Sequence, residues 1–179
     1  MVHAPLAAAL AVAALALPGV AGAVSEPSGL DGKLRASSDE EPALLLSGGG
    51  TQVFTCRVMG TDPETYSWAF VAPDATLRDG ARSVARHASV NQWESIVDGS
   101  SVGGSIRAAQ AAGGDNLPWL LMRAIPAGDS GIFAGVTSIQ RVNTQGGVAP
   151  AGGCDANHQG EEARVAFSAD YYFYKRRGG

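Results

Sequence analysis

The segment of this chain that comes closest to a catalytic motif is Gly99-Ser100-Ser101-Val102-Gly103. It matches Gly-x-Ser-x-Gly, the strand-to-helix turn that exposes the nucleophilic serine of α/β-hydrolases. Asp129 or Asp155, followed by His158, would complete the order Ser, Asp, His of that fold's triad. The same pattern also suits a Gly/Ser turn between two strands, and the alternating strands and long helices of that fold are missing. A secreted serine hydrolase using Ser101 is therefore the alternative function.

A second candidate group is His87, Trp93 and Asp98, on two segments joined by a short link. If the segments form a hairpin, the three side chains lie close together, and His87 and Asp98 could perform acid–base chemistry. Trp93 has polar neighbours in the sequence, so we expect it to be exposed, where an indole can stack on a sugar ring. Trp68 and Trp119 are expected in the core.

A second loop region lies between residues 141 and 158. Strand packing does not require its unusual residues, which are Arg141, Asn143, Thr144, the Gly146-Gly147 pair and Asp155. Glycine pairs beside polar side chains let a backbone approach a ligand closely. Alternatively, the glycine pair only turns the chain and Arg141 pairs with a carboxylate such as Asp170.

The two loop regions would make a binding site only if they met at one end of the domain. They would then form one concave pocket, with four candidate ligand-binding residues: Trp93, Asp98, Arg141 and Thr144. If His87, Asp98 and Arg141 instead lie apart, they are local scaffolding.

No cofactor and no metal site are predicted. His87 and His158 have no neighbours at ligand spacing. The run Gly48-Gly49-Gly50 does not follow G-x-G-x-x-G, and the sequence after it is strand-like, so no helix N-terminus is available for a pyrophosphate.

Short strands must position these residues. In residues 164–174 the apolar positions alternate, with Val165, Phe167, Ala169, Tyr171 and Phe173 on one face. Residues 107–112 are the one segment with helical character. About eight short strands between Gly and Pro breaks predict an all-β single domain, either a sandwich or a partly closed barrel.

The first 23 residues have the composition of a secretory signal peptide. An apolar run over residues 6–17 ends at Pro18-Gly19, and Ala21-Gly22-Ala23 offers a small-x-small cleavage site. The run is shorter than the about 20 residues of a membrane span. We therefore predict a signal peptide (1–23), a polar N-terminal arm or linker (24–43) and a single β-rich domain (44–179).

Export would bring Cys56 and Cys154, the chain's two cysteines, into an oxidising compartment where they can pair. A disulfide closing a loop of about 100 residues restrains the unfolded chain by about 4–5 kcal/mol. Half of a metal site is the alternative, although the spacing fits no zinc pattern. The mild net charge of −4 argues against nucleic acid as a partner.

Several segments occur together in a known family. They are residues 49–56, 93–94 with 98–100, 117–121, 135–147, 149–150 with Cys154, and 169–174. With these segments the chain resembles a family of secreted bacterial and fungal proteins known as domain of unknown function 3455. The resemblance implies no activity. Some members carry a malate dehydrogenase label, but this sequence lacks the nucleotide-binding residues that such an activity needs.

The sequence thus predicts a secreted, non-catalytic binding protein. Its partner would be an unknown extracellular ligand, with a carbohydrate, the cell wall or another cell-surface component as candidates. This prediction rests on elimination. The sequence shows no residues spaced as metal ligands, no cofactor-binding loop, no convincing catalytic triad and no membrane span.

Export predicts that the mature protein begins at Val24. Intact mass spectrometry of the protein recovered from the medium should show the chain without its first 23 residues. Secreted protein that still begins at Met1 would contradict the prediction.

Overall fold

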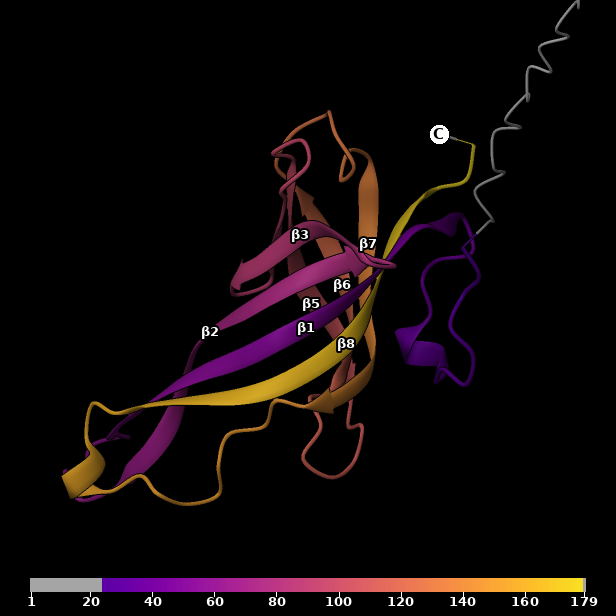
Figure 1. Ribbon diagram of the computed structural model, residues 1–179. Helices are drawn as coiled ribbons and strands as arrows, with labels where there is room; N and C mark the ends of the chain where they lie inside the picture. Colours follow the sequence, from indigo (N-terminus) through magenta and orange to yellow (C-terminus); the bar gives the residue numbers. More distant parts are fainter. Residues whose placement is uncertain (1–23, 179) are drawn as a thin grey trace, which may run out of the picture.

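The chain folds into an antiparallel up-and-down β-barrel of eight strands, as the computed structural model of residues 24–178 shows (Figure 1). The strands are β1 (Glu40–Val58), β2 (Tyr66–Asp79), β3 (Arg82–Ser89), β4 (Gln92–Ser95), β5 (Ser101–Gln110), β6 (Trp119–Pro126), β7 (Val136–Gly146) and β8 (Glu162–Arg176). Each strand pairs with the next, and β8 returns to pair with β1. The predicted all-β class is confirmed, in its barrel form. The predicted signal peptide, residues 1–23, lies outside the described residues.

Helix is limited to two short 3-10 turns within residues 24–178, η1 (Gly32–Leu34) and η2 (Ala156–His158). None of the helices in this range has the length and apolar character that a membrane crossing needs. The barrel's own strands therefore supply almost all of the regular structure.

Strand β8 shows how the alternation of the sequence becomes a core. Four of its five predicted inward residues are buried inside the barrel, namely Phe167, Ala169, Tyr171 and Phe173, whereas Val165 is only half-buried. Tyr172 and Tyr174 point outward and are buried as well, because the segment before β1 covers them. In that segment Leu34 is fully buried, and its carbonyl accepts a hydrogen bond from the Gln140 side chain.

Two glycines, Gly48 and Gly50, let β1 curve against its neighbours. A Cβ on Gly48 would lie 2.6 Å from Cε2 of Tyr171, and one on Gly50 would lie 2.1 Å from the carbonyl oxygen of Asp74. Any side chain at these positions would push the strands apart. The glycine run that follows Ser47 is therefore a packing feature of the barrel.

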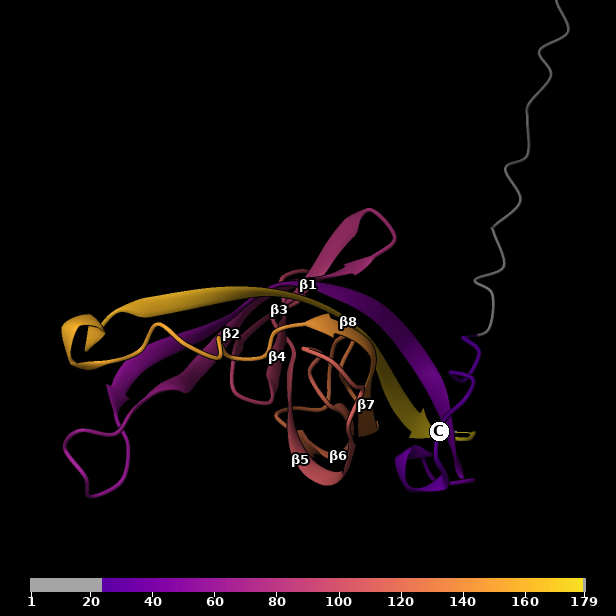
Figure 2. The same ribbon diagram turned by 90° about the horizontal axis from the view of Figure 1, so that it is seen from below.

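Strands β1, β2 and β8 extend past the barrel on one side, with η2 at the tip of the extension (Figures 1 and 2). The predicted disulfide joins Cys56, near the end of β1, to Cys154 in the connection between β7 and β8. It therefore ties a long connection to the sheet.

The prediction of a helical segment at residues 107–112 is wrong. Residues 107–110 continue β5, with a register shift between the pairs Ile106–Met122 and Ala108–Leu121. The ladder to β6 satisfies the backbone of this segment, and that outweighs the helical preference of its alanines.

Removing the disulfide should destabilise the fold. The double variant Cys56→Ser, Cys154→Ser is expected to lose about 2–5 kcal/mol in urea unfolding, since the closed loop no longer restrains the unfolded chain. Treating the wild-type protein with a reductant is the matched control and should give the same loss. An unchanged unfolding midpoint in both would contradict the expected contribution.

Candidate ligand-binding site

A cavity of about 400 Å³ opens at one end of the barrel. Small-molecule sites in proteins typically measure about 300–1,000 Å³. The connections β3–β4, β5–β6 and β7–β8 all lie at this end and contribute to the lining, with Asn91, Leu117 and Val148 among their residues. The opening exists because β4 is short. It pairs with β5 only between Gln92–Gly103 and Glu94–Ser101, so Ile106 has no neighbour from β4.

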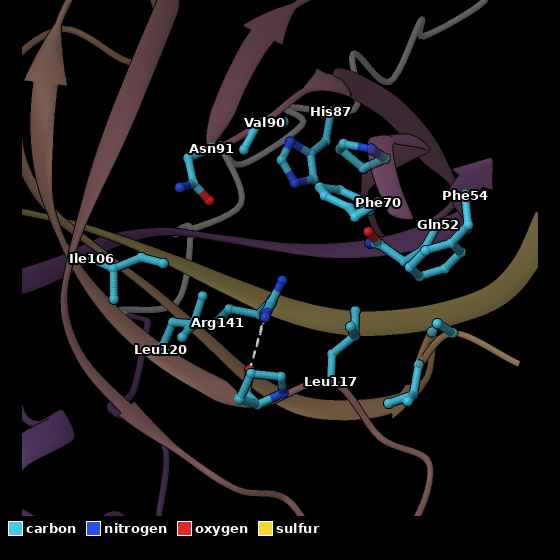
Figure 3. Close-up of a pocket in the computed structure, with 15 residues that line it drawn as sticks. Gln52, Phe54, Phe70, His87, Val90, Asn91, Ile106, Leu117, Leu120 and Arg141 are labelled. Atoms are coloured by element: carbon cyan, nitrogen blue, oxygen red, sulfur yellow. Dashed lines mark hydrogen bonds between the residues drawn. The ribbon is translucent and has the colours of Figure 1, made fainter. Parts of the chain in front are cut away.

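The walls of the cavity are mostly apolar (Figure 3). Phe54 and Phe70 meet edge to face, with ring centroids 5.7 Å apart. The other apolar side chains of the wall are Pro73, Val90, Ile106, Leu117, Pro118, Leu120, Val148 and Ala149. No Asp or Glu lines the cavity, so its polar chemistry rests on a few neutral groups and one cation.

Beneath the cavity lies a layer of aromatic side chains. His87 stacks on Trp93 with ring centroids 4.7 Å apart, and the ring of Tyr171 approaches both edge-on. Gly104 makes room for this layer, because a Cβ there would lie 3.3 Å from the Trp93 ring. The layer separates the cavity from the packed core at the other end of the barrel.

His87 is a neutral imidazole that lines the cavity. Its Nδ1 lies 2.8 Å from the carbonyl oxygen of Gln92 and donates to it, since a carbonyl can only accept. The other ring nitrogen, Nε2, is then a hydrogen-bond acceptor. Burial is the main reason why the pKa of His87 is lowered from 6.5 to about 4; the hydrogen bond to Gln92 opposes this shift and the nearby charge of Arg141 adds to it.

Arg141 is the cation of the cavity. Its Nε and Nη2 both donate to the carbonyl oxygen of Pro118, at 3.2 and 2.9 Å (Figure 3). Burial lowers the pKa of Arg141, but a guanidinium remains charged at any physiological pH. The expected alternative pairing with Asp170 is wrong, because that carboxylate accepts from Asn143 and Ser47 instead.

Two further polar side chains accompany Arg141. Gln52, on β1, lines the cavity and is only 4% exposed. The hydroxyl of Tyr171 is fully buried and makes no hydrogen bond of good geometry to any residue in the range 24–178. Burial raises the pKa of Tyr171 to about 12, and the neighbouring guanidinium of Arg141 opposes that rise.

Thr144 supports the cavity wall without lining it. Its hydroxyl donates to the carbonyl of Leu117, while Arg141 binds the next carbonyl, that of Pro118. These two residues of β7 therefore fix the segment before β6, which carries part of the wall.

The prediction that Trp93 is exposed is wrong, since its side chain is 1% exposed and lies beneath His87. Trp93 points inward on β4, where a large ring fills the barrel. Trp68 and Trp119, expected in the core, are only half-buried. Trp68 donates to the carbonyl of Gly152 outside the barrel core. The three indoles form no sugar-stacking platform.

Asp98 does not join His87 and Arg141. It lies in the β4–β5 connection, at the opposite end of this up-and-down barrel from the cavity. Its carboxylate accepts from the hydroxyl and amide of Ser100 and from the amide of Ile132, which holds the pKa of Asp98 well below its usual range. Asp98 thus stabilises a turn, whereas His87 and Arg141 line the same cavity.

The residues of the candidate triad are also separated. Ser101 begins β5 and pairs with Glu94. His158 lies in η2, bonded to Asp155 at 2.7 Å, at the tip of the strand extension (Figures 1 and 2). The structure gives Ser101 no histidine partner among residues 24–178.

The sequence did not predict Gln52 and Phe54 as residues that line the site, or Tyr171 as the buried neighbour of Arg141. A signal for Gln52 was present, since it shares the period-two face of Phe54 and Cys56 and is a polar residue at a core position. Tyr171 was assigned to the core face of its strand, and nothing in the sequence places its hydroxyl beside a guanidinium.

The lowered pKa of His87 makes stability depend on pH. The unfolded chain binds a proton near pH 6.5 and the folded chain only near pH 4, so the free energy of unfolding falls as the pH drops through this window. The expected loss between pH 7.5 and pH 4 is about 3 kcal/mol. His87→Gln should remove this part of the pH dependence in urea unfolding, whereas His158→Gln should not. Parallel losses in wild type and His87→Gln would contradict the burial argument.

A family model described as "Protein of unknown function (DUF3455)" matches residues 37–175. No curated protein and no solved structure matches the chain. The matched range runs from just before β1 to the last residue but one of β8 and includes every residue that lines the cavity. The chain therefore belongs to the family of proteins of unknown function DUF3455.

Proposed function

We propose that this protein is an exported, non-catalytic binding protein that takes a small, largely apolar molecule into the cavity at the end of its barrel. The observation that carries the proposal is the cavity itself, about 400 Å³ in volume, apolar on most sides and supplied with a few convergent polar groups. Cavities of this kind are the usual form of small-molecule sites.

The lining favours an apolar ligand over the glycan considered from the sequence. A sugar presents hydroxyl groups that need many hydrogen-bond partners, and the cavity offers mainly Gln52, His87, Asn91 and Arg141. Burial of apolar ligand surface against side chains such as Phe54 and Leu120 would supply the larger part of the binding free energy.

The same lining supports binding without catalysis. No Ser, Thr, Cys, Asp or Glu side chain lines the cavity, so it contains neither a hydroxyl or thiol nucleophile nor a carboxylate base. The His87 ring is fixed in place, because its Nδ1 donates a hydrogen bond to the carbonyl of Gln92 and the ring stacks on Trp93.

Export is supported by two observations of different kinds. The first 23 residues have signal-peptide composition. The disulfide between Cys56 and Cys154 fits a protein that works in an oxidising compartment.

The proposal predicts that the neutral fluorophore N-phenyl-1-naphthylamine binds and gains fluorescence. Ile106→Trp should weaken binding by about tenfold or more, since Ile106 lines the mouth and is 52% exposed, so a larger side chain obstructs entry without disturbing the core. Ile125→Trp is the matched control. Ile125 is 51% exposed on the neighbouring strand β6 and does not line the cavity.

Fluorescence titration of the wild type, Ile106→Trp and Ile125→Trp tests whether the cavity binds the fluorophore. No binding by the wild type, or equal binding by Ile106→Trp and Ile125→Trp, would contradict a ligand site in the cavity. A fluorophosphonate that labels wild type but not Ser101→Ala would contradict the absence of catalysis and favour the hydrolase alternative.

A further inference from the structure

Arg141 places an uncompensated positive charge inside an otherwise apolar cavity. No salt bridge within residues 24–178 includes Arg141, and no acidic side chain lines the cavity. Arg141 is half-buried, so its charge loses part of its hydration and gains no counter-ion in exchange. A negatively charged group bound in the cavity would supply that counter-ion.

The geometry of Arg141 leaves one end of its guanidinium free. The carbonyl of Pro118 accepts hydrogen bonds from Nε and Nη2, which fixes the plane of the guanidinium. Nη1 makes no hydrogen bond of good geometry to any residue in the range 24–178, although the Tyr171 hydroxyl lies close enough to favour the charged guanidinium, and this end of the group points into the cavity (Figure 3). The Nη1 and Nη2 edge of a fixed guanidinium presents parallel N–H groups, the arrangement that a planar carboxylate accepts with both oxygens.

The groups around Arg141 also favour a single negative charge. Gln52, which lines the cavity, and the hydroxyl of Tyr171, which lies beside the guanidinium, are both neutral groups. His87 is neutral, so Arg141 is the one cation that lines the cavity. One guanidinium balances a carboxylate, whereas a doubly charged phosphate monoester would remain partly uncompensated.

We propose that the ligand is a carboxylate-headed amphiphile whose head pairs with Arg141 and whose apolar body lies against the cavity walls. This inference rests on the proposed binding function and assigns the chemical class of its ligand. The head would lie against the Arg141 guanidinium at the cavity wall, and the body would pass Leu120 and Phe54 towards the mouth.

Three probes with the same chain and different heads test the proposal. Isothermal titration calorimetry at pH 7.5 would measure octanoate, octanol and octylammonium against the mature protein. Octanoate should bind about ten- to a hundredfold more tightly than octanol, the range expected for a charge-assisted hydrogen-bonded pair. Octylammonium should bind most weakly, because its charge repels Arg141.

Variants assign the preference to the guanidinium. Arg141→Met should bind octanoate no better than octanol, while Arg123→Met, which removes an exposed arginine of β6 that does not line the cavity, should behave as wild type. Arg141→Lys keeps the charge and loses the planar fork, so it should retain a reduced preference for octanoate. This variant decides the question if Arg141→Met does not fold.

The outcomes separate this inference from the function on which it rests. If octanoate and octanol bind wild type equally, or if Arg141→Met keeps the preference for octanoate, the carboxylate inference is wrong and the apolar binding function stands. If none of the three probes binds, and N-phenyl-1-naphthylamine does not bind either, the binding function itself is wrong.

Discussion

Closure of the sheet between β1 and β8 is the constraint on which the rest of this structure depends. Once β8 pairs with β1 along most of its length, every strand has two neighbours and alternate side chains must point into the barrel. Closure demands a tight curve in β1, and Gly48 and Gly50 permit it because their neighbours leave no room for a Cβ. The interior then has a limited volume, which the large aromatic residues of β4 and β8 divide.

The cavity follows from how that interior is filled. One end is packed with side chains such as Phe133 and Phe173, and the layer of His87, Trp93 and Tyr171 closes it off. Beyond this layer the short β4 leaves the barrel wall incomplete, and the inward positions of β1 and β7 carry Gln52 and Arg141. Burying a polar side chain in a filled core costs free energy, whereas the same side chain beside a cavity can bind a polar group of a ligand. Gln52 and Arg141 therefore point to a binding role for the cavity.

Local periodicity allowed the sequence to predict the strand class and the inward face of β8, and the presence of two cysteines in a chain with an export signal predicted their pairing. Periodicity could not predict which loops lie at the same end of the barrel, because that depends on the order of the strands. The order places His87 and Arg141 at the same end of the barrel and Asp98 at the other. Trp93 has polar sequence neighbours yet points inward, since alternate residues of a short strand face opposite sides. The polar neighbours of Trp93 therefore led to a wrong prediction, because burial in a strand depends on which face a residue occupies and not on its neighbours in the sequence.

The most direct test of the account is a crystal structure of the mature protein grown with octanoate. The account predicts one octanoate in the barrel-end cavity, with its carboxylate within hydrogen-bond distance of the Arg141 guanidinium and its chain along Leu120 and Phe54. An empty cavity with octanoate bound elsewhere would contradict it, as would a chain in the cavity whose carboxylate points to solvent away from Arg141.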